Sequence, residues 1–548
     1  MRSEDLRLHW NEGRAPRREL FAALVGAGPE LARRYPENEV AVREALASRL
    51  GIETDGLLIT AGADDAIDRV FRLWGGRGRS LVVPDPTFQM IPAFAGMSGT
   101  EVRRVGDMWL QFPLEEVLAA IDSSTGVVAI VSPNNPSGAV ASRADIEMVS
   151  NEIPNGSVVL LDAAYVEFAD HDLTEFALSL PNVIVTRTLS KAWGLAGLRV
   201  GYAASRSENI RSLSEIGSPY PVSSVALALA AEELQTGEAL MTSYTARVRE
   251  ERSRLEMTLK RLGLEALPSQ GNFVFAGTHR AAWIRSALGS IGVQVRVLES
   301  WPDGIRVTCP GDEKDFLRLE AALNTVLVPE ALLFDMDGVL ADVSESYRAA
   351  IRETVTSFGA EVTDDEIDAR KAAGNANDDW ALSRAILSDK GIRKSLPEVV
   401  ERFEMIYQGS DTRRGLRERE RLLATPDLLE GLAQRFALGI VTGRPYADAQ
   451  RFLEEQGIAR FFSTVVARED APSKPDPAPV ELALARLGAS SAWMLGDTPD
   501  DLLAAREAGV LPIAMAPPGA GPRLTEGLLA ANPAAVINSP SEIKGYLQ

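Results

Sequence analysis

The chain has 548 residues, of which 45% are hydrophobic and 24% charged, a balance typical of a soluble globular protein with at least two domains. Its 57 basic and 77 acidic residues leave a formal charge of −20, which argues against nonspecific nucleic-acid binding, because such binding needs a basic surface. Small anionic substrates remain compatible with this charge, since a local pocket can be positive on an acidic protein.

Cysteine and histidine are scarce. Cys309 is the only cysteine, which excludes an internal disulfide and a cysteine-based metal cluster, and the three scattered histidines argue against a histidine-built zinc site. Residues 1–16 lack the apolar core of a signal peptide, and no window approaches the apolar length of a membrane span. We therefore expect a cytoplasmic enzyme with no nucleic-acid or membrane partner.

Short apolar runs rich in β-forming residues alternate with helical patterns, and each ends in a turn rich in Pro, Gly, Asn or Asp. The first series of predicted strands is Ser80–Val83, Gly126–Val131, Ser157–Leu161, Val183–Thr186 and Val200–Ala204. The second series is Ala331–Phe334, Ala437–Val441, Thr464–Ala467, Ser491–Leu495 and Leu511–Ala514. Runs that are apolar on both faces and alternate with helices indicate a mostly parallel sheet covered on both sides. The predicted fold class is therefore α/β, with two such sheets.

A predicted helix over Glu313–Val326, followed by Val328-Pro329-Glu330, separates the two series. No Gly/Ser-rich spacer follows this helix, so the join is short and restricts how freely the domains move. We predict one domain over residues 1–329 and another over residues 330–548. The segment from about 341 to 425 is polar, helical and poor in strands, which indicates a helical insertion between the first two strands of the second sheet.

Lys191 is the first candidate catalytic residue. It lies in Thr186–Gly201, TRTLSKAWGLAGLRVG, where a predicted strand ends in a turn of small residues and hydroxyls. A lysine that forms a Schiff base with an aldehyde cofactor needs its ammonium pKa lowered by burial or nearby positive charge. Arg199 could supply that charge and also contact a phosphate. Lysines in turns are usually only solvated, so the neighbouring motifs decide the interpretation.

Two upstream strand ends carry residues that suit a pyridine ring. In LLDAAY, Asp162 ends a buried strand, where a carboxylate can pair with a protonated ring nitrogen, and Tyr165 can reach a ring hydroxyl. In VSPNNPSG, a rigid turn presents Asn135. Singly, Asp162 would be a helix cap and Asn135 an ordinary turn residue. Together, at strand ends of one sheet, they indicate a ligand site.

Two further segments support a phosphorylated, flat cofactor. Gly62 precedes a predicted helix in ITAGADDAIDRVFRLW, and free backbone N–H groups at such a helix start bind phosphate. Phe88, in the Pro-rich loop PDPTFQMIP, could stack on a ring, although core packing is the commoner fate of a phenylalanine.

In this order, the motifs resemble those of the fold-type-I pyridoxal phosphate (PLP) aminotransferases, most closely the histidinol-phosphate aminotransferase group, over residues 5 to about 328. The resemblance implies that Lys191 holds the cofactor as a Schiff base and shuttles the proton. It further implies cofactor contacts from the backbone of Ala63 and Asp64 and from Thr188, Ser190 and Arg199 at the phosphate, Asp162 at the ring nitrogen, Asn135 and Tyr165 at the ring oxygen, and Phe88 on the ring face. Tyr35, in RRYPE, would reach the cofactor phosphate of the partner subunit, so a homodimer is expected.

The resemblance also implies substrate contacts. Arg306, in GIRVTCPGDE, would grip the anionic end of the substrate with Arg296 as a second contact, because a guanidinium suits a carboxylate and a phosphate equally well. Two segments depart from the family pattern. Asn11-Glu12 is followed by Gly13-Arg14 where the family has an Asn-Glu-Asn-Pro type segment, and VTCPG after Arg306 differs from the usual Gly-Thr type ending. Both segments concern the substrate, so the amino donor and acceptor stay open.

The second series of strands carries a different chemistry. In ALLFDMDGVL, an apolar strand ends in Asp335 and Asp337, whose oxygens can hold Mg²⁺ and one of which can attack phosphorus. A calcium loop also has DxDG, but Val-Leu follows the glycine here and the downstream ligands are missing. Later strands and loops add four more candidates: Thr442 in LGIVTGR, Lys474 in SKPDP, and Asp497 and Asp501 in WMLGDTPDD.

These four motifs, in this order, resemble those of the haloacid dehalogenase-like hydrolases over residues 331–548, in particular the phosphoglycolate-phosphatase-like branch with its helical cap. The resemblance implies that Asp335 is the nucleophile and a metal ligand, and that Asp337 is the general acid/base with its carbonyl on the metal. Thr442 and Lys474 would stabilise the phosphoryl group. Asp497 would complete the metal site, assisted by Asp501.

The sequence therefore predicts a bifunctional enzyme that uses PLP and Mg²⁺ on small-molecule substrates. One hypothesis is two consecutive steps of histidine biosynthesis: transamination of imidazole-acetol phosphate to histidinol phosphate, then dephosphorylation to histidinol. The alternatives are an aminotransferase for aromatic or other phosphorylated amines with an unrelated phosphatase, a PLP decarboxylase or lyase, and a chain in which one half is a noncatalytic regulatory module. Fold and motifs alone do not choose among these activities.

Overall fold

The computed structural model describes residues 5–298, 303–374, 378–410, 413–516 and 521–547. Residues 1–4, at the start of the predicted first domain, lie outside this description. Among the described residues, no helix combines the length and the apolar character that crossing a membrane requires.

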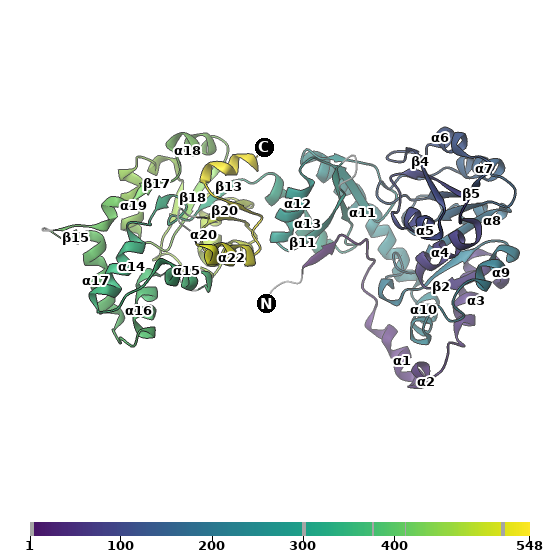
Figure 1. Cartoon of the computed structure of the whole chain (residues 1–548), viewed down its shortest axis with the longest axis horizontal. Coiled ribbons are helices and arrows are strands. Elements are labelled where there is room, and N and C mark those ends of the chain that lie inside the picture. The colour runs from purple at the N-terminus through teal and green to yellow at the C-terminus, as the bar shows by residue number, and fades with distance from the viewer. Residues whose placement is uncertain (1–4, 299–302, 375–377, 411–412, 517–520, 548) are drawn as a thin grey trace. The chain divides into compact units, whose positions relative to one another are not determined.

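Two compact units make up the chain (Figure 1). The N-terminal unit comprises Arg7–Ala281 and Val295–Leu317, and the C-terminal unit comprises the remainder, including Ala282–Gln294 and everything from Arg318 onward. Helix α12 (Ala281–Ser290) and most of helix α13 (Glu313–Leu327) therefore count with the C-terminal unit.

The N-terminal unit is organised around a seven-stranded sheet with the order β2-β8-β7-β6-β5-β3-β4. Its strands are β2 (Leu57–Thr60), β3 (Ser80–Asp85), β4 (Glu101–Asp107), β5 (Thr125–Val131), β6 (Val158–Asp162), β7 (Val183–Thr188) and β8 (Gly201–Ala204). Neighbouring strands are parallel except for β8, which is antiparallel to both β2 and β7. The predicted strands of this part are all present, with ends shifted by one or two residues.

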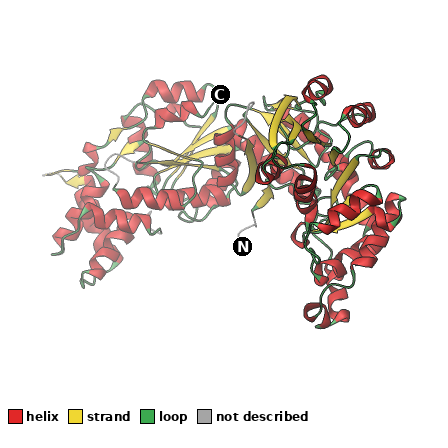
Figure 2. Ribbon diagram, turned by 45° about the vertical axis from the view of Figure 1, so that its right-hand side comes forward, coloured by secondary structure: helices red, strands yellow, loops and turns green. Residues whose placement is uncertain are grey.

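Strand β5 explains why this sheet is buried on both sides. Successive side chains of a strand point to opposite faces. Val127 and Ala129 pack into one apolar cluster, whereas Val128 and Ile130 pack into the other. Helices α4 (Gly62–Trp74), α5 (Met90–Ser98) and α9 (Ser207–Glu215) contribute to the first cluster, and helices α6 (Leu114–Ala120), α7 (Arg143–Glu152) and α8 (Thr174–Ser179) to the second. Figure 2 shows helices, in red, lying alongside the strands, in yellow.

A second, five-stranded sheet has the order β1-β11-β12-β10-β9. Its strands are β1 (Leu6–Leu8), β9 (Glu265–Ala266), β10 (Phe273–Gly277), β11 (Val293–Leu298) and β12 (Gly304–Thr308). Helices α3 (Glu39–Leu50), α10 (Ser224–Thr236) and α11 (Glu238–Arg261) complete the longer elements of the N-terminal unit, and α11, with 24 residues, leads from the first sheet to the second.

The C-terminal unit contains a six-stranded parallel sheet with the order β19-β18-β13-β20-β21-β22. Its strands are β13 (Ala331–Phe334), β18 (Ala437–Val441), β19 (Thr464–Val466), β20 (Ala492–Gly496), β21 (Leu511–Met515) and β22 (Ala535–Ile537). Besides α12 and most of α13, its helices outside the insertion are α18 (Pro426–Ala433), α19 (Tyr446–Glu455), α20 (Ala478–Leu487), α21 (Pro499–Glu507) and α22 (Pro522–Ala530). Buried Trp493 on β20 donates its indole N–H to the Thr325 carbonyl at 2.6 Å, which ties α13 to this sheet.

The helical insertion between β13 and β18 is present. It contains α14 (Tyr347–Ser357), α15 (Asp364–Ala372), α16 (Asp379–Asp389) and α17 (Leu396–Gln408), and Figure 1 shows α14, α16 and α17 grouped together away from the sheet strands. A two-stranded pair joins the insertion to the core: β14 (Ala341–Asp342) leads in, and β17 (Arg421–Leu422) leads out, antiparallel to it. We call this inserted segment the cap and this pair the linker strands.

Two candidate active sites

The floor of the first site lies where β5, β6 and β7 end side by side. Asp162 is the last residue of β6, and its register partners are Val131 and Thr186. Its Oδ1 accepts the backbone N–H of Ala164 at 3.2 Å and the hydroxyl of Thr186 at 3.5 Å. Burial raises the pKa of this carboxyl to about 7, because water no longer solvates its charge. A cationic group held against Asp162 would restore the ionised form.

Lys191 approaches the same cavity from the turn after β7. Its Nζ donates to the Trp10 carbonyl at 3.2 Å and lies 5.4 Å from the centroid of the Tyr165 ring. The Tyr165 hydroxyl in turn accepts the side-chain amide of Asn11 at 3.0 Å. The amine and the phenol therefore converge on one space above Asp162.

The opposite end of the cavity is suited to an anion. Helix α4 begins at Gly62, so its first backbone N–H groups have no partners within the helix. Arg199, held in the left-handed conformation with φ 53°, donates to Asp64 Oδ2 at 2.9 Å and to Ser190 Oγ at 3.3 Å. Gly62 has φ 77°, a backbone conformation that favours glycine, and it lies close to the Arg199 guanidinium.

The residues predicted to bind the cofactor largely share one cavity. It is lined by Ala63, Asp64, Phe88, Asn135, Asp162, Ala164, Tyr165, Thr188, Ser190, Lys191 and Arg199. Tyr35 lies elsewhere, 75% exposed and stacked on Tyr220 with the ring centroids 4.8 Å apart. The cavity offers an amine, a buried carboxyl that favours a cation, an aromatic wall and an anion-binding end, and this donor set fits PLP.

A neighbouring cavity of about 290 Å³ shares Lys191, Phe88, Asn135 and Tyr165 and adds two arginines, Arg296 and Arg306. These arginines are directly opposite each other across β11 and β12. Buried Arg306 donates to Asn135 Oδ1 at 2.5 Å and to the His9 carbonyl at 2.8 Å, and burial lowers its pKa to about 10. Like charges facing each other across strands are destabilising, and an anionic ligand between the two guanidinium groups would relieve this repulsion.

The segment before Ala15 contributes residues that the motifs did not identify. Asn11 is buried and left-handed with φ 53°; besides holding Tyr165, its Oδ1 accepts the Thr308 hydroxyl at 2.9 Å. A Cβ on Gly13 would lie 1.8 Å from the Lys191 carbonyl oxygen. Here the departure from the family pattern has a physical reason, because only glycine allows the segment to pass so close to the lysine turn. The unusual Asn-Glu-Gly sequence was the available signal.

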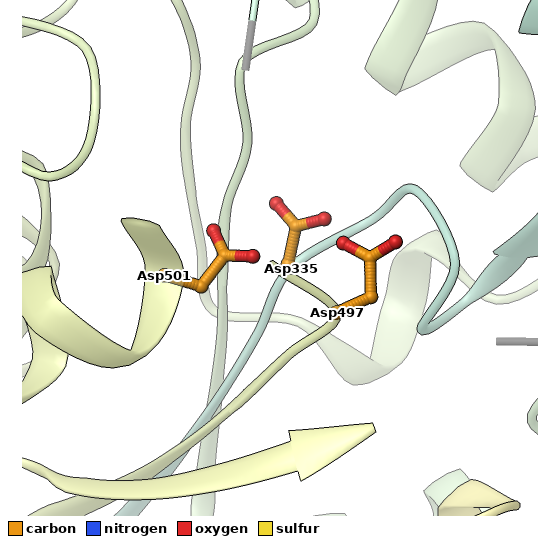
Figure 3. A group of neighbouring side chains, drawn as sticks. All are labelled: Asp335, Asp497 and Asp501. Carbon is orange, nitrogen blue, oxygen red and sulfur yellow. The ribbon is translucent and has the colours of Figure 1, made fainter. Parts of the chain in front are cut away.

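In the C-terminal unit, three buried carboxylates converge at the strand ends (Figure 3). Asp335 follows β13, and Asp497 and Asp501 follow β20; one oxygen of each lies within 4.8 Å of the others. Lys474 Nζ bonds Asp335 Oδ1 at 2.6 Å and Asp501 Oδ1 at 2.5 Å. Burial raises the pKa of Asp335 to about 7 and that of Asp497 well above its usual range. Crowded carboxylates of this kind could hold a divalent cation.

Glycine and threonine complete this site. Gly338 has φ 75°, and a Cβ there would lie 2.2 Å from Asp497 Oδ2, so the loop after Asp335 passes against the carboxylate group only as glycine. Thr442 follows β18 and is buried, and its hydroxyl accepts the backbone N–H of Arg444 at 3.1 Å.

Asp337 differs from the other predicted metal-site residues in where its carboxyl points. Its Oδ1 accepts Nε and Nη2 of Arg444 at 2.7 and 2.5 Å, and it is not part of the three-carboxylate group. Only its backbone carbonyl was expected on the metal, so this arrangement leaves the side chain for another role. Arg444 was not identified from the sequence, although it closes the LGIVTGR motif.

Two family models match the chain, one over each half. The model of the family "Aminotransferase class I and II" matches residues 17–323, and that of "haloacid dehalogenase-like hydrolase" matches residues 329–509. The predictions of these two families, of the α/β fold and of an enzyme are thereby confirmed.

Several relatives are similar over one part of the chain. A histidinol-phosphate aminotransferase 2 of Pseudomonas fluorescens is 34% identical over 54% of this chain and 83% of its own, and an aromatic amino acid aminotransferase of Corynebacterium glutamicum is 34% identical over 54% and 86%. An imidazoleglycerol-phosphate dehydratase of Phytophthora nicotianae is 45% identical over 190 residues, which is 33% of this chain and less than half, 42%, of that relative.

Among solved structures, the histidinol-phosphate aminotransferase of Sinorhizobium meliloti in complex with pyridoxal-5'-phosphate has a TM-score of 0.53 at 25% identity, covering 59% of this chain and 90% of its own. The chain therefore belongs to the class I and II aminotransferases and carries a haloacid dehalogenase-like hydrolase domain after the aminotransferase domain.

Proposed function

We propose that the N-terminal domain transaminates a phosphorylated keto substrate of the imidazole-acetol phosphate type, and that the C-terminal domain hydrolyses a phosphate monoester. The observation that carries the first half is the pair Arg296 and Arg306, opposed across two strands in the cavity that also contains Lys191. Two guanidinium groups suit a substrate that presents a carboxylate in one half-reaction and a phosphate in the other.

The residues of the aminotransferase site divide the work. Bound PLP supplies an electron sink for the substrate carbon. Lys191 Nζ takes the proton from that carbon and returns it, because it is the amine that faces the cavity. Asp162 holds the positive charge of the ring nitrogen, and Arg199 with the start of α4 binds the cofactor phosphate. Asn135 accepts a hydrogen bond from Arg306, which fixes this proposed substrate-binding arginine next to the cofactor cavity.

The hydrolase residues support a two-step displacement. Asp335 attacks phosphorus as the bond to the leaving oxygen breaks, and Asp337 gives that oxygen a proton. Water then attacks phosphorus, its proton returns to Asp337, and the bond to Asp335 breaks to release phosphate. Lys474 and Thr442 stabilise the phosphoryl oxygens. Asp335, Asp497, the Asp337 carbonyl and Asp501 would hold Mg²⁺, which would offset the charge of the phosphate.

The two reactions would be consecutive if the amine made by the first domain is the ester cleaved by the second. The dehydratase relative supports this substrate class, because loss of water from an imidazole-bearing glycerol phosphate gives an enol that becomes the corresponding keto phosphate. Transamination of that ketone gives histidinol phosphate, and hydrolysis gives histidinol.

A second candidate is transamination of aromatic amino acids. It is favoured by the similarity to an aromatic amino acid aminotransferase and by Trp10 and Phe88, which both line the substrate cavity. In that case the hydrolase domain would act on an unrelated ester.

A homodimer also belongs to this proposal. Tyr35 is 75% exposed and does not line the cofactor cavity of its own chain. In a dimer it would bind the cofactor phosphate of the partner subunit.

The deciding experiment incubates the chain with PLP, Mg²⁺, glutamate and imidazole-acetol phosphate, and follows 2-oxoglutarate and phosphate separately. Lys191→Ala should abolish both products and Asp335→Asn only phosphate, whereas Lys260→Ala, at an exposed position of α11, should change neither. Turnover of an aromatic keto acid with none of the keto phosphate would favour the second candidate. Bound cofactor without any product would remove both substrate assignments.

A further inference from the structure

The phosphatase domain contains a buried arginine that no part of the proposed mechanism uses. Arg444 lies two residues after Thr442, and its side chain is 1% exposed. Its peptide is fixed on both sides: the N–H donates to Thr442 Oγ1 at 3.1 Å, and the carbonyl accepts the Arg468 N–H at 3.0 Å. The guanidinium carbon lies 4.8 Å from the centroid of the Tyr347 ring and 5.4 Å from that of Phe452. Such a group is too enclosed to serve as a solvated surface charge.

The guanidinium joins two carboxylates that come from different parts of the domain. Asp337, in the loop after β13, accepts hydrogen bonds from Nε and Nη2 of Arg444 at 2.7 and 2.5 Å. Glu420, immediately before linker strand β17, accepts hydrogen bonds from Nη1 of Arg444 at 2.9 Å and from its Nη2 at 3.2 Å. A planar guanidinium presents its donors in a fixed fork, so holding one carboxylate fixes the direction of the other.

Both bonds from Arg444 to Asp337 end on the same oxygen, Oδ1. The other oxygen, Oδ2, is therefore the one left for a proton transfer, and the Asp337 side chain remains 22% exposed. A general acid must hold its proton within hydrogen-bond reach of the leaving oxygen, so its orientation matters as much as its presence.

Glu420 is itself held from the cap. Its Oε1 accepts the hydroxyls of Ser346 and Tyr407, each at 3.0 Å, and its side chain is 4% exposed. Ser346 lies just before α14 and Tyr407 in α17, so Glu420 connects the cap to Arg444 close to the linker strands. The contacts form a continuous series from cap to Glu420 to Arg444 to Asp337.

We infer that Arg444 is a positioning residue for the general acid/base: anchored by Glu420, it holds Asp337 Oδ1 so that Oδ2 faces the leaving oxygen of the phosphate ester. The inference rests on the proposed phosphatase function. It makes proton donation depend on the cap side of the domain, whereas attack by Asp335 does not need Arg444.

The test uses leaving-group dependence, because a badly placed general acid matters most when the leaving group is a poor one. We would measure kcat/KM of the full chain with Mg²⁺ for p-nitrophenyl phosphate and phenyl phosphate. Arg444→Lys keeps the positive charge but cannot bridge the two carboxylates. It should lose at least about tenfold more activity on phenyl phosphate than on p-nitrophenyl phosphate, within the range that general acid catalysis contributes.

Further variants keep this test independent of folding. Glu420→Gln leaves Arg444 in place and should show the same selective loss to a smaller extent. In Asp337→Asn, adding Arg444→Lys should cause little further loss on phenyl phosphate, because the acid is already absent. Arg486→Lys, at an arginine paired with Asp470 on the surface, should lose no selectivity.

The outcomes separate the inference from the function beneath it. An equal loss on both esters in Arg444→Lys and Glu420→Gln would overturn the positioning role and leave the phosphatase function standing. No release of phosphate from either ester by the unsubstituted chain would overturn the phosphatase function, and the inference with it.

Discussion

Replacing Asp162 with asparagine should stabilise the cofactor-free protein and at the same time remove its cofactor chemistry. Burial raises the pKa of this carboxyl from 3.8 to about 7. An acid whose pKa is higher in the folded state contributes most to stability when protonated, and this contribution is lost as the pH rises. The loss begins near pH 4, where the unfolded chain ionises, and is complete above pH 7. About three pKa units correspond to roughly 4 kcal/mol.

The assay is urea unfolding of the cofactor-free chain at pH 5 and pH 8. Hydrogen exchange of peptides that cover β5, β6 and β7 reports the unfolding of this sheet separately from the second domain. The free energy of unfolding of Asp162→Asn, relative to that of the unsubstituted chain, should increase by roughly 2–3 kcal/mol from pH 5 to pH 8. An advantage that is the same at pH 5 and pH 8 would refute the reasoning, because the buried charge would not then be the cause.

In the presence of the cofactor, the same substitution should be harmful. An amide cannot neutralise a protonated ring nitrogen, and breaking a buried charged pair costs on the order of 3–5 kcal/mol, so kcat/KM for transamination should fall by roughly a thousandfold. Asp145→Asn, at a capping residue of α7, should leave transamination unchanged. Transamination by Asp162→Asn near the unsubstituted rate would contradict the role of this carboxyl.

Three further predictions follow from the geometry. Gly338→Ala should reduce phosphate release at least about 100-fold without affecting transamination, because its Cβ would lie 2.2 Å from Asp497 Oδ2. Gly391→Ala is the control for backbone strain, since Gly391 has φ 80° and open space around it. An equal loss of phosphate release in both variants would contradict the role of the contact with Asp497. Burial raises the pKa of Glu251 to about 7, so the unsubstituted chain loses stability as this carboxyl ionises between pH 5 and pH 8. Over this range the free energy of unfolding of Glu251→Gln should therefore rise by about 1–3 kcal/mol relative to that of the unsubstituted chain. Thermal unfolding at both pH values measures this difference, and a difference that does not change with pH would contradict the prediction. Chelation with EDTA should stop phosphate release and spare 2-oxoglutarate formation, with activity restored by Mg²⁺; undiminished release in EDTA would remove the metal from the mechanism.

The sequence alone was sufficient for much of the fold and for the residues at strand ends. Runs such as Gly126–Val131 are apolar at every position, which favours a strand buried on both faces. Because ligands of an α/β sheet bind at the carboxyl ends of its strands, polar residues directly after such runs, such as Asp162 and Asp335, could be identified from local order.

Contacts between segments far apart in the chain required the tertiary structure. Arg444 and Asp337 are 107 positions apart, and nothing near either residue in the sequence indicates the ion pair. Asn11 and Thr308 are separated by 297 positions, yet their hydrogen bond holds the N-terminal segment against β12. The assignment of α12 and most of α13 to the C-terminal unit likewise depends on packing. Local periodicity determines which face of an element is buried, whereas the partner it meets depends on how the whole chain folds back on itself.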